Sequence, residues 1–452
     1  MSMKRSRGLH LVVIVTLALI ALLVNAFTGV AGLRAIQDPA PPKFESASTT
    51  VPQEAAEGYK LPSEKYALAR AYRKEGYLLY FLTAAYSLLV LWVLLRCRLA
   101  PLLRNWAENV SGRRWLQLLL FGPTLLFVFG ILLLPTDAYD QWRMRRYGLS
   151  VEGWGSWLWD WIAAQTAILV AGTVIIGLLY YAMRRSPKRW WLILWLIAVP
   201  LLVLIVFVQP ILIDPLFNTF EPLDVTHPEL VDSIEKLLGR AKLTIPREHI
   251  YLLKVGDKST EVDASSEGFG PSKRVFVTDT IIVSEPGAAI LHTLGHEIGH
   301  YVLSLDWIVF VICLPLSLAL LCFTDRVFVL ALARWGATWS IRGPDDWASL
   351  PVLALVVSLI AMVLTPAVNS LSRYREYEAD RYGLELIHGI VPDAGEAAAE
   401  AFQKDAEINL DDPKPPSFIK WWLFDHPPVN ERILFCRTYD PWSNGRKPKY
   451  VE

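Results

Sequence analysis

The chain has 452 residues, and 53% of them are hydrophobic, against roughly 45–50% in soluble domains. Lys and Arg balance Asp and Glu at 44 each, so no basic field indicates a nucleic acid partner. The composition therefore disfavours an ordinary soluble domain and a nucleic-acid-binding protein. It favours a protein that resides partly in a lipid bilayer.

Long apolar runs with almost no charge predict helices that cross this bilayer, because a helix satisfies its own backbone polar groups in hydrocarbon. The first run follows Lys4, Arg5 and Arg7, so it is either a retained anchor or a cleaved signal peptide. Trp and Tyr crowd the ends of the runs, as in interfacial aromatic belts. Seven spans are predicted in chain order, near residues 9–27, 78–97, 115–134, 157–182, 190–213, 305–323 and 349–369.

Two polar segments flank the last two predicted spans, so any soluble chemistry must be assembled from both. Residues 228–240 have helical periodicity, residues 249–255 and 273–282 are β-rich, and further helices are expected near 285–304 and 367–390. The predicted division has five parts: residues 1–77 with the first span and a loop, 78–213 with spans two to five, 214–304, 305–369 with the last two spans, and 370–452.

The helix expected near 285–304 carries an H-E-x-x-H motif, His296-Glu297-Ile298-Gly299-His300. Spacing by four places both imidazoles on one helical face, where they can bind one tetrahedral Zn²⁺, while Glu297 can act as the base on the attacking water. Two ordinary buried histidines are the alternative reading. The intervening Glu297 in an otherwise apolar helix disfavours it.

A second motif can complete the metal site, since a catalytic zinc needs three protein ligands and one open position. Glu376 and Asp380 form an E-x-x-x-D motif on the helix expected after the last span. We predict that Glu376 is the third ligand and that Asp380, one turn further on the same face, holds a ligand histidine by its second nitrogen. Glu378 and His292 are the rival ligands, and plain surface ion pairing of Glu376 and Asp380 is the non-metal alternative.

Together these features resemble the CAAX prenyl protease 1 family of integral-membrane zinc peptidases. The resemblance includes the order of spans and motifs and the C-terminal His426-Pro427-Pro428-Val429-Asn430-Glu431-Arg432. It also includes Tyr147-Gly148-Leu149-Ser150, Asp214-Pro215-Leu216-Phe217-Asn218 and Gly268-Phe269-Gly270-Pro271-Ser272-Lys273-Arg274, so it covers most of residues 60–440.

The resemblance implies a mainly α polytopic protein, in which about seven helices enclose a chamber, with a zincin-like domain and a small β element. It implies one Zn²⁺ per chain and a peptide or protein substrate, possibly lipidated, from which a C-terminal tripeptide is removed. Residues 273–282 are expected in the strand region beside the metal. His426 and Arg432 are expected to line the site as donors to substrate or to the developing oxyanion. The alternative makes His426 part of an extended tail and Arg432 a surface partner of Glu431.

Two other functions stay open: a membrane quality-control peptidase of the HtpX type, and a zinc-binding scaffold or transporter without proteolysis. Glu297 disfavours the scaffold, because a structural site needs no base, and acidic residues within the runs, such as Asp160, lie only near the ends of the runs. Asp263-Ala264-Ser265 departs from the Asn-Ala-aromatic pattern expected in the family. Loops 96–114 and 183–189 carry five and four Lys or Arg, so the positive-inside rule places them in the cytoplasm and the metal domain on the opposite side of the membrane. In the eukaryotic members of the family, by contrast, the metal domain faces the cytosol.

Overall fold

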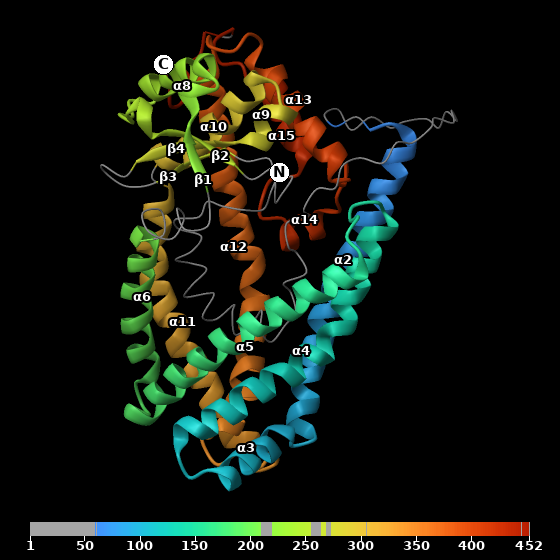
Figure 1. The fold of residues 1–452 in the computed structure, drawn as a ribbon, viewed down its shortest axis with the longest axis vertical. Helices are drawn as coiled ribbons and strands as arrows, with labels where there is room; N and C mark the ends of the chain where they lie inside the picture. The colour runs from blue at the N-terminus through green and yellow to red at the C-terminus, as the bar shows by residue number, and fades with distance from the viewer. Residues whose placement is uncertain are drawn as a thin grey trace.

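A computed structural model describes residues 59, 61–208, 219–254, 264–267, 273–303, 305–443 and 445–451. Long helices form one part of the molecule, and a lobe of shorter helices around a small sheet lies at one end of them (Figure 1). The first predicted span, residues 9–27, lies outside the described residues. The mainly α, polytopic fold expected from the sequence is confirmed.

Five of the described helices are long and apolar enough to cross a membrane. They are α2 (Ser63–Arg96), α4 (Arg114–Arg146), α5 (Trp154–Arg185), α11 (Leu305–Trp335) and α12 (Leu350–Ile387). The predicted span at 190–213 corresponds to the apolar helix α6 (Trp190–Val208), which is shorter. The count of seven spans is thus higher than the five that these residues show.

Helix α12 joins the last membrane span to the lobe without interruption (Figure 1). The sequence suggested a span at 349–369 and a separate helix near 367–390, but the structure has one helix of 38 residues. Pro366 lies inside it and cannot donate a backbone hydrogen bond, yet the helix continues through it. Because residues that face the lobe share a rigid rod with the membrane span, the site is tied directly to the membrane part.

The lobe contains a four-stranded sheet in the order β1-β2-β4-β3. Its strands are β1 (Thr219–Pro222), β2 (Ile250–Lys254), β3 (Ala264–Glu267) and β4 (Arg274–Thr278). The β4 strand pairs parallel with β2 and antiparallel with β3, so the strand region expected at 273–282 is an interior strand followed by the short helix α9 (Asp279–Ser284). The edge strand that packs on the metal-site helix α10 (Gly287–Val302) is β3.

Apolar side chains from both polar segments of the sequence form the core of the lobe. One cluster joins α8 (Pro228–Arg240), the sheet, α10 and the end of α12. Another joins the start of α2 to α13 (Ala394–Ile408) and α15 (Val429–Thr438). Helix α3 (Leu99–Val110) lies at the end away from the lobe, and α14 (Ser417–Leu423) packs on α12 (Figure 1). Short 3₁₀ turns lie at Leu223–Val225, Arg247–His249 and Trp347–Ser349.

Candidate metal centre

Glycines allow the two motif-bearing helices, α10 and α12, to approach each other closely. A Cβ atom on Gly383 would lie 2.9 Å from the backbone nitrogen of His296, and one on Gly299 would lie 3.1 Å from the Cβ of Tyr382. No larger side chain fits at this crossing without movement of backbone. The two motifs therefore meet across one tight helix–helix contact.

Three side chains converge where these helices cross. The Nε2 atoms of His296 and His300 lie 3.2 Å apart, and they lie 3.3 and 3.4 Å from the two carboxylate oxygens of Glu376. All three side chains are buried. Among the described residues they form the one group of His, Cys, Asp or Glu that can offer three ligand atoms within 4.8 Å of one another.

The chemistry of this donor set fits a bound Zn²⁺. Two imidazoles and one carboxylate are a common set of catalytic zinc ligands, which leaves a fourth position for water or substrate. The Oε2 atom of Glu376 is buried and makes no hydrogen bond of good geometry among the described residues, although Nε2 of His296 and Nε2 of His426 lie 3.3 and 3.2 Å from it. Because a buried carboxylate oxygen without a good hydrogen bond is costly, this site calls for a cation.

Asp380 fixes the orientation of the first histidine. Its Oδ1 accepts a hydrogen bond from Nδ1 of His296 at 2.8 Å, which leaves Nε2 of the ring as a lone-pair donor directed at the cluster. Burial acts to lower the pKa of His296, but the nearby carboxylates of Asp380 and Glu376 outweigh it and raise the pKa to about 10. The carboxylates thus favour positive charge at this point, as a metal cation would provide.

Arg432 of α15 binds Asp380 from the other side. Its Nε donates to Oδ2 of Asp380 at 2.7 Å and one Nη donates to Oδ1, while its guanidinium lies 4.0 Å from the ring centroid of Phe402. Arg432 is 4% exposed and Asp380 is fully buried. The guanidinium is therefore not a surface partner of Glu431, which instead accepts hydrogen bonds from Lys420.

Two further predicted residues border the cluster. Glu297 lies on α10 between the two histidines and is partly buried. His426 precedes α15, and its Nε2 lies 3.2 Å from Oε2 of Glu376. Burial acts to lower the pKa of His426, but the carboxylates of Glu376 and Asp425 outweigh it and raise the pKa. His426 thus lies at the cluster rather than in a remote tail.

The rival ligands that the sequence left open lie outside the cluster. Glu378 accepts hydrogen bonds from Arg381, Lys449 and Tyr450. His292 is buried edge-on against Phe402, and burial lowers its pKa to about 3, so its ring is neutral. Neither side chain belongs to the group of three.

Two residues near the site were not anticipated from the sequence. Asp425 approaches Nδ1 of His426 at 3.0 Å, and Phe402 lies between Arg432 and His292. The position of Asp425 directly before His-Pro-Pro is a signal that could have suggested its role. Phe402 carries no such signal, because it comes from a helix without any recognisable motif.

Comparison with known proteins covers both parts of the chain. Residues 43–219 match the CAAX prenyl protease N-terminal domain of five membrane helices, and residues 224–439 match peptidase family M48. An uncharacterized metalloprotease, YhfN of Bacillus subtilis (strain 168), is 31% identical over 397 residues, which are 86% of this chain and 91% of that protein. The CAAX prenyl protease 1 homolog of Caenorhabditis elegans is 25% identical over 413 residues, or 83% and 88% of the two chains.

The fold also matches a solved structure. The crystal structure of S. mikatae Ste24p superposes with a TM-score of 0.68 at 18% sequence identity, and the match covers 94% of this chain and 99% of that one. Two adjacent family matches, a relative that is similar over nearly its whole length and this shared fold all agree with the spans and the ligand cluster. The chain therefore belongs to peptidase family M48, within the CAAX prenyl protease 1 group, and is an integral, multi-pass membrane metalloendopeptidase.

Proposed function

We propose that this peptidase uses one Zn²⁺ per chain, held by His296, His300 and Glu376. The observation that carries the proposal is the convergence of these three buried side chains from two helices. When bound, zinc would polarise the scissile carbonyl and lower the pKa of a water in the open position. We also propose that the segments 214–304 and 370–452 act as the two halves of one catalytic domain, linked by the spans within 305–369.

The protein side chains divide the remaining tasks. Glu297, between the two ligands, takes the proton from the attacking water and passes it to the leaving amine. His426 donates a hydrogen bond to the oxyanion that develops on the substrate, because its Nε2 reaches the cluster. Asp380 holds His296 in its ligating tautomer. No covalent intermediate is required.

The substrate we propose is a membrane-associated protein with a flexible C-terminal segment, as in C-terminal processing of prenylated proteins. The name of the Caenorhabditis elegans relative supports this substrate class. The membrane span that continues into the lobe as α12 also supports it, because the proposed metal site then stands close to a substrate held in the bilayer. A peptide ending in a farnesylated Cys-aliphatic-aliphatic-X motif, compared with the same peptide without farnesyl, tests the requirement for the lipid. Equal cleavage of both would contradict it.

The first prediction separates the base from the ligands. Glu297→Gln should keep its zinc and its thermal stability, while activity falls toward the upper end of the roughly 10²–10⁴-fold range of general-base contributions. This corresponds to about 4–5 kcal/mol in the barrier. Metal analysis and turnover of an unstructured peptide measure the two effects.

Two histidine variants are the matched controls for this experiment. His300→Ala should lose zinc, whereas His292→Ala, which removes a buried imidazole outside the cluster, should keep it. Full zinc in His300→Ala would overturn the ligand assignment. A Glu297→Gln enzyme that turns over at the wild-type rate would overturn the mechanism.

A further inference from the structure

Helix α12, which carries Glu376 and Asp380, has two more buried carboxylates, Glu378 and Glu385, on the side away from the metal cluster. At about 100° per residue, they lie roughly half a turn around the helix from Glu376 and within about 20° of each other. Glu385 is fully buried and Glu378 is 4% exposed. Buried carboxylates are tolerated only where hydrogen bonds or opposite charges compensate them, so hydrogen-bond donors or cations must lie beside this pair.

The chain segment that follows α15 provides this compensation. Three consecutive backbone N–H groups donate to Glu385: that of Lys449 to Oε1 at 2.8 Å, and those of Tyr450 and Val451 to Oε2 at 2.6 and 2.9 Å. The hydroxyl of Tyr439 also donates to Oε1. One carboxylate thus binds a bent backbone segment together with the residue that follows α15.

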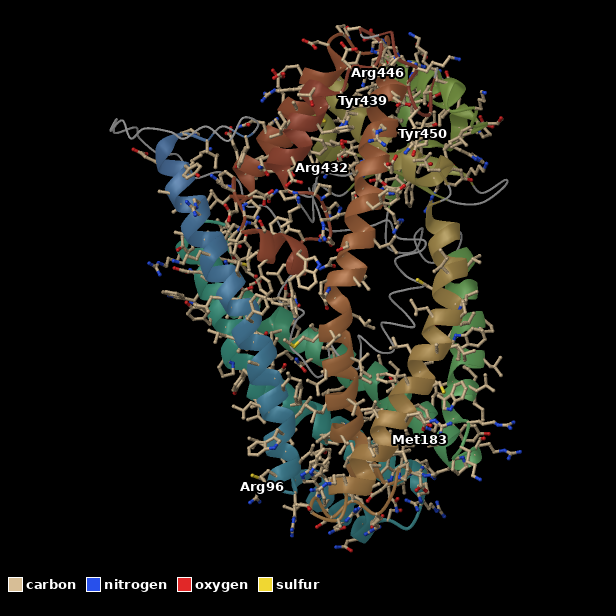
Figure 2. All side chains as sticks on the ribbon, turned by 180° about the vertical axis from the view of Figure 1, so that it is seen from behind. Arg96, Met183, Arg432, Tyr439, Arg446 and Tyr450 are labelled. Carbon is tan, nitrogen blue, oxygen red and sulfur yellow. The ribbon has the colours of Figure 1, made fainter. Side chains whose placement is uncertain are left out.

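Side chains of the same segment bind Glu378. Nζ of Lys449 lies 2.9 Å and the hydroxyl of Tyr450 lies 2.5 Å from Oε2 of Glu378. The ring of Tyr450 packs near Tyr382, and Val451 is buried in the core of the lobe. Figure 2 shows Tyr439 and Tyr450 beside the upper end of α12, on the lobe.

We propose that residues Lys449–Val451 form a strap that positions the catalytic helix α12. The strap binds the back of the helix at Glu378 and Glu385, while Gly383 and its neighbours on the front press against α10. It thereby fixes the rotation and depth of Glu376 and Asp380 relative to the two histidines. The strap lies beyond residues 224–439, which match the peptidase family, so the match itself does not account for it.

This inference rests on the proposed zinc site, and its effect should appear in how firmly that site holds its metal. Loosening the strap leaves every ligand in place but removes the restraint on the helix that carries Glu376. We expect zinc to transfer to a chelator about ten-fold faster, by analogy with the roughly 10–100-fold loss of metal affinity when groups that orient metal ligands are removed. The comparison is made well below the melting temperature, where a change in global stability alone would not alter the rate.

Two variants loosen the strap from opposite sides. Glu385→Gln removes the buried charge, and Tyr450→Pro removes one of the backbone donors together with the Tyr450 side chain, without changing any residue of α12. Tyr450→Phe isolates the contribution of the hydroxyl on Glu378. Glu396→Gln is the matched control, because it removes a similar carboxylate from an exposed pair with Arg437, and exposed pairs contribute little.

The double variant tests the contact itself. In the double variant Glu385→Gln/Tyr450→Pro, the lost N–H of residue 450 should matter less because Glu385 no longer carries its charge. The decrease in melting temperature of the double variant should therefore be smaller than the sum of the two single decreases. Additive shifts, or strap variants that release zinc at the wild-type rate, would overturn the strap alone. Purified wild-type protein that holds no zinc would instead overturn the metal site on which it depends. If Glu385→Gln does not fold, Tyr450→Pro alone decides the zinc test.

Discussion

Asp380 is the residue through which the metal site is tied to the rest of the lobe. It accepts from His296 on α10 and from Arg432 on α15, and it stands one turn beyond the proposed ligand Glu376. A fully buried carboxylate between a histidine and an arginine keeps its charge and holds both partners in fixed orientations. The placement of His296 therefore depends, through Asp380, on Arg432, which comes from the last tenth of the chain.

Arg432 is the test of this dependence. We expect Arg432→Lys to lower zinc affinity by about 10–100-fold, because a lysine cannot reproduce the two-pronged hydrogen bond that orients Asp380. Competition with a chelator and steady-state kinetics at saturating zinc measure the affinity and the turnover separately. Unchanged affinity with a large loss of turnover would instead support the oxyanion role that the sequence resemblance implied for Arg432.

The two motifs that carry the proposed ligands could be predicted from the sequence, because helical spacing alone brings His296 beside His300 and Glu376 beside Asp380. Sequence spacing says nothing about which side chain from another element meets them. The hydrogen bond of the Arg432 guanidinium to Asp380 was not part of the expected role of Arg432 as a donor to substrate or oxyanion, and Phe402 was not expected at all. Such contacts depend on how α13 and α15 dock on the lobe.

At the scale of elements, the crossing of α10 and α12 determines the distance between ligands. Gly383→Ala would place a methyl group 2.9 Å from the backbone nitrogen of His296, closer than real Cβ atoms come, so the helices must separate. We expect loss of zinc and destabilisation, which overpacking makes typically about 1–3 kcal/mol. Metal content and thermal unfolding measure both.

A glycine in open space is the control for this variant. Gly239 lies in α8 with no atom within 4 Å of a Cβ built there, so Gly239→Ala should be neutral or stabilising and should retain zinc. Equal behaviour of the two variants would show that the tight crossing does not control the site.

Helices and strands were predicted well where one pattern of apolar residues continues along the whole element. They were predicted poorly where an apolar span passes into a polar helix. The helix expected at 228–240 matches α8, and the β-rich run at 249–255 matches β2. By contrast, the span near 349–369 and the motif helix after it are one continuous α12. Hydropathy marks where a helix enters water but carries no information about whether the helix ends there.

For the whole molecule, the distribution of charge favours one orientation in the membrane. The end away from the lobe contains α3 and the short connections near residues 96–114 and 183–189, which have five and four Lys or Arg (Figure 1). Arg96 and Met183 lie at this end, opposite Arg432 in the lobe (Figure 2). The short connection at residues 147–153, near the lobe end, follows three arginines of α4. The positive-inside rule therefore predicts that the α3 end lies in the cytoplasm and the catalytic lobe on the exoplasmic side.

A native cysteine makes this orientation testable. Cys97 is exposed and lies in the connection that follows α2, so a membrane-impermeant maleimide should label it only after the cells are permeabilised. In a Cys97→Ser background, Lys236→Cys on the exposed face of α8 should be labelled in intact cells if the lobe faces outward, as the charge distribution predicts. The two sites report opposite sides of the bilayer, so failure of the reagent cannot mimic the result. Labelling of Cys97 in intact cells with protection of Lys236→Cys would place the lobe in the cytoplasm and limit its substrates to cytoplasmic proteins.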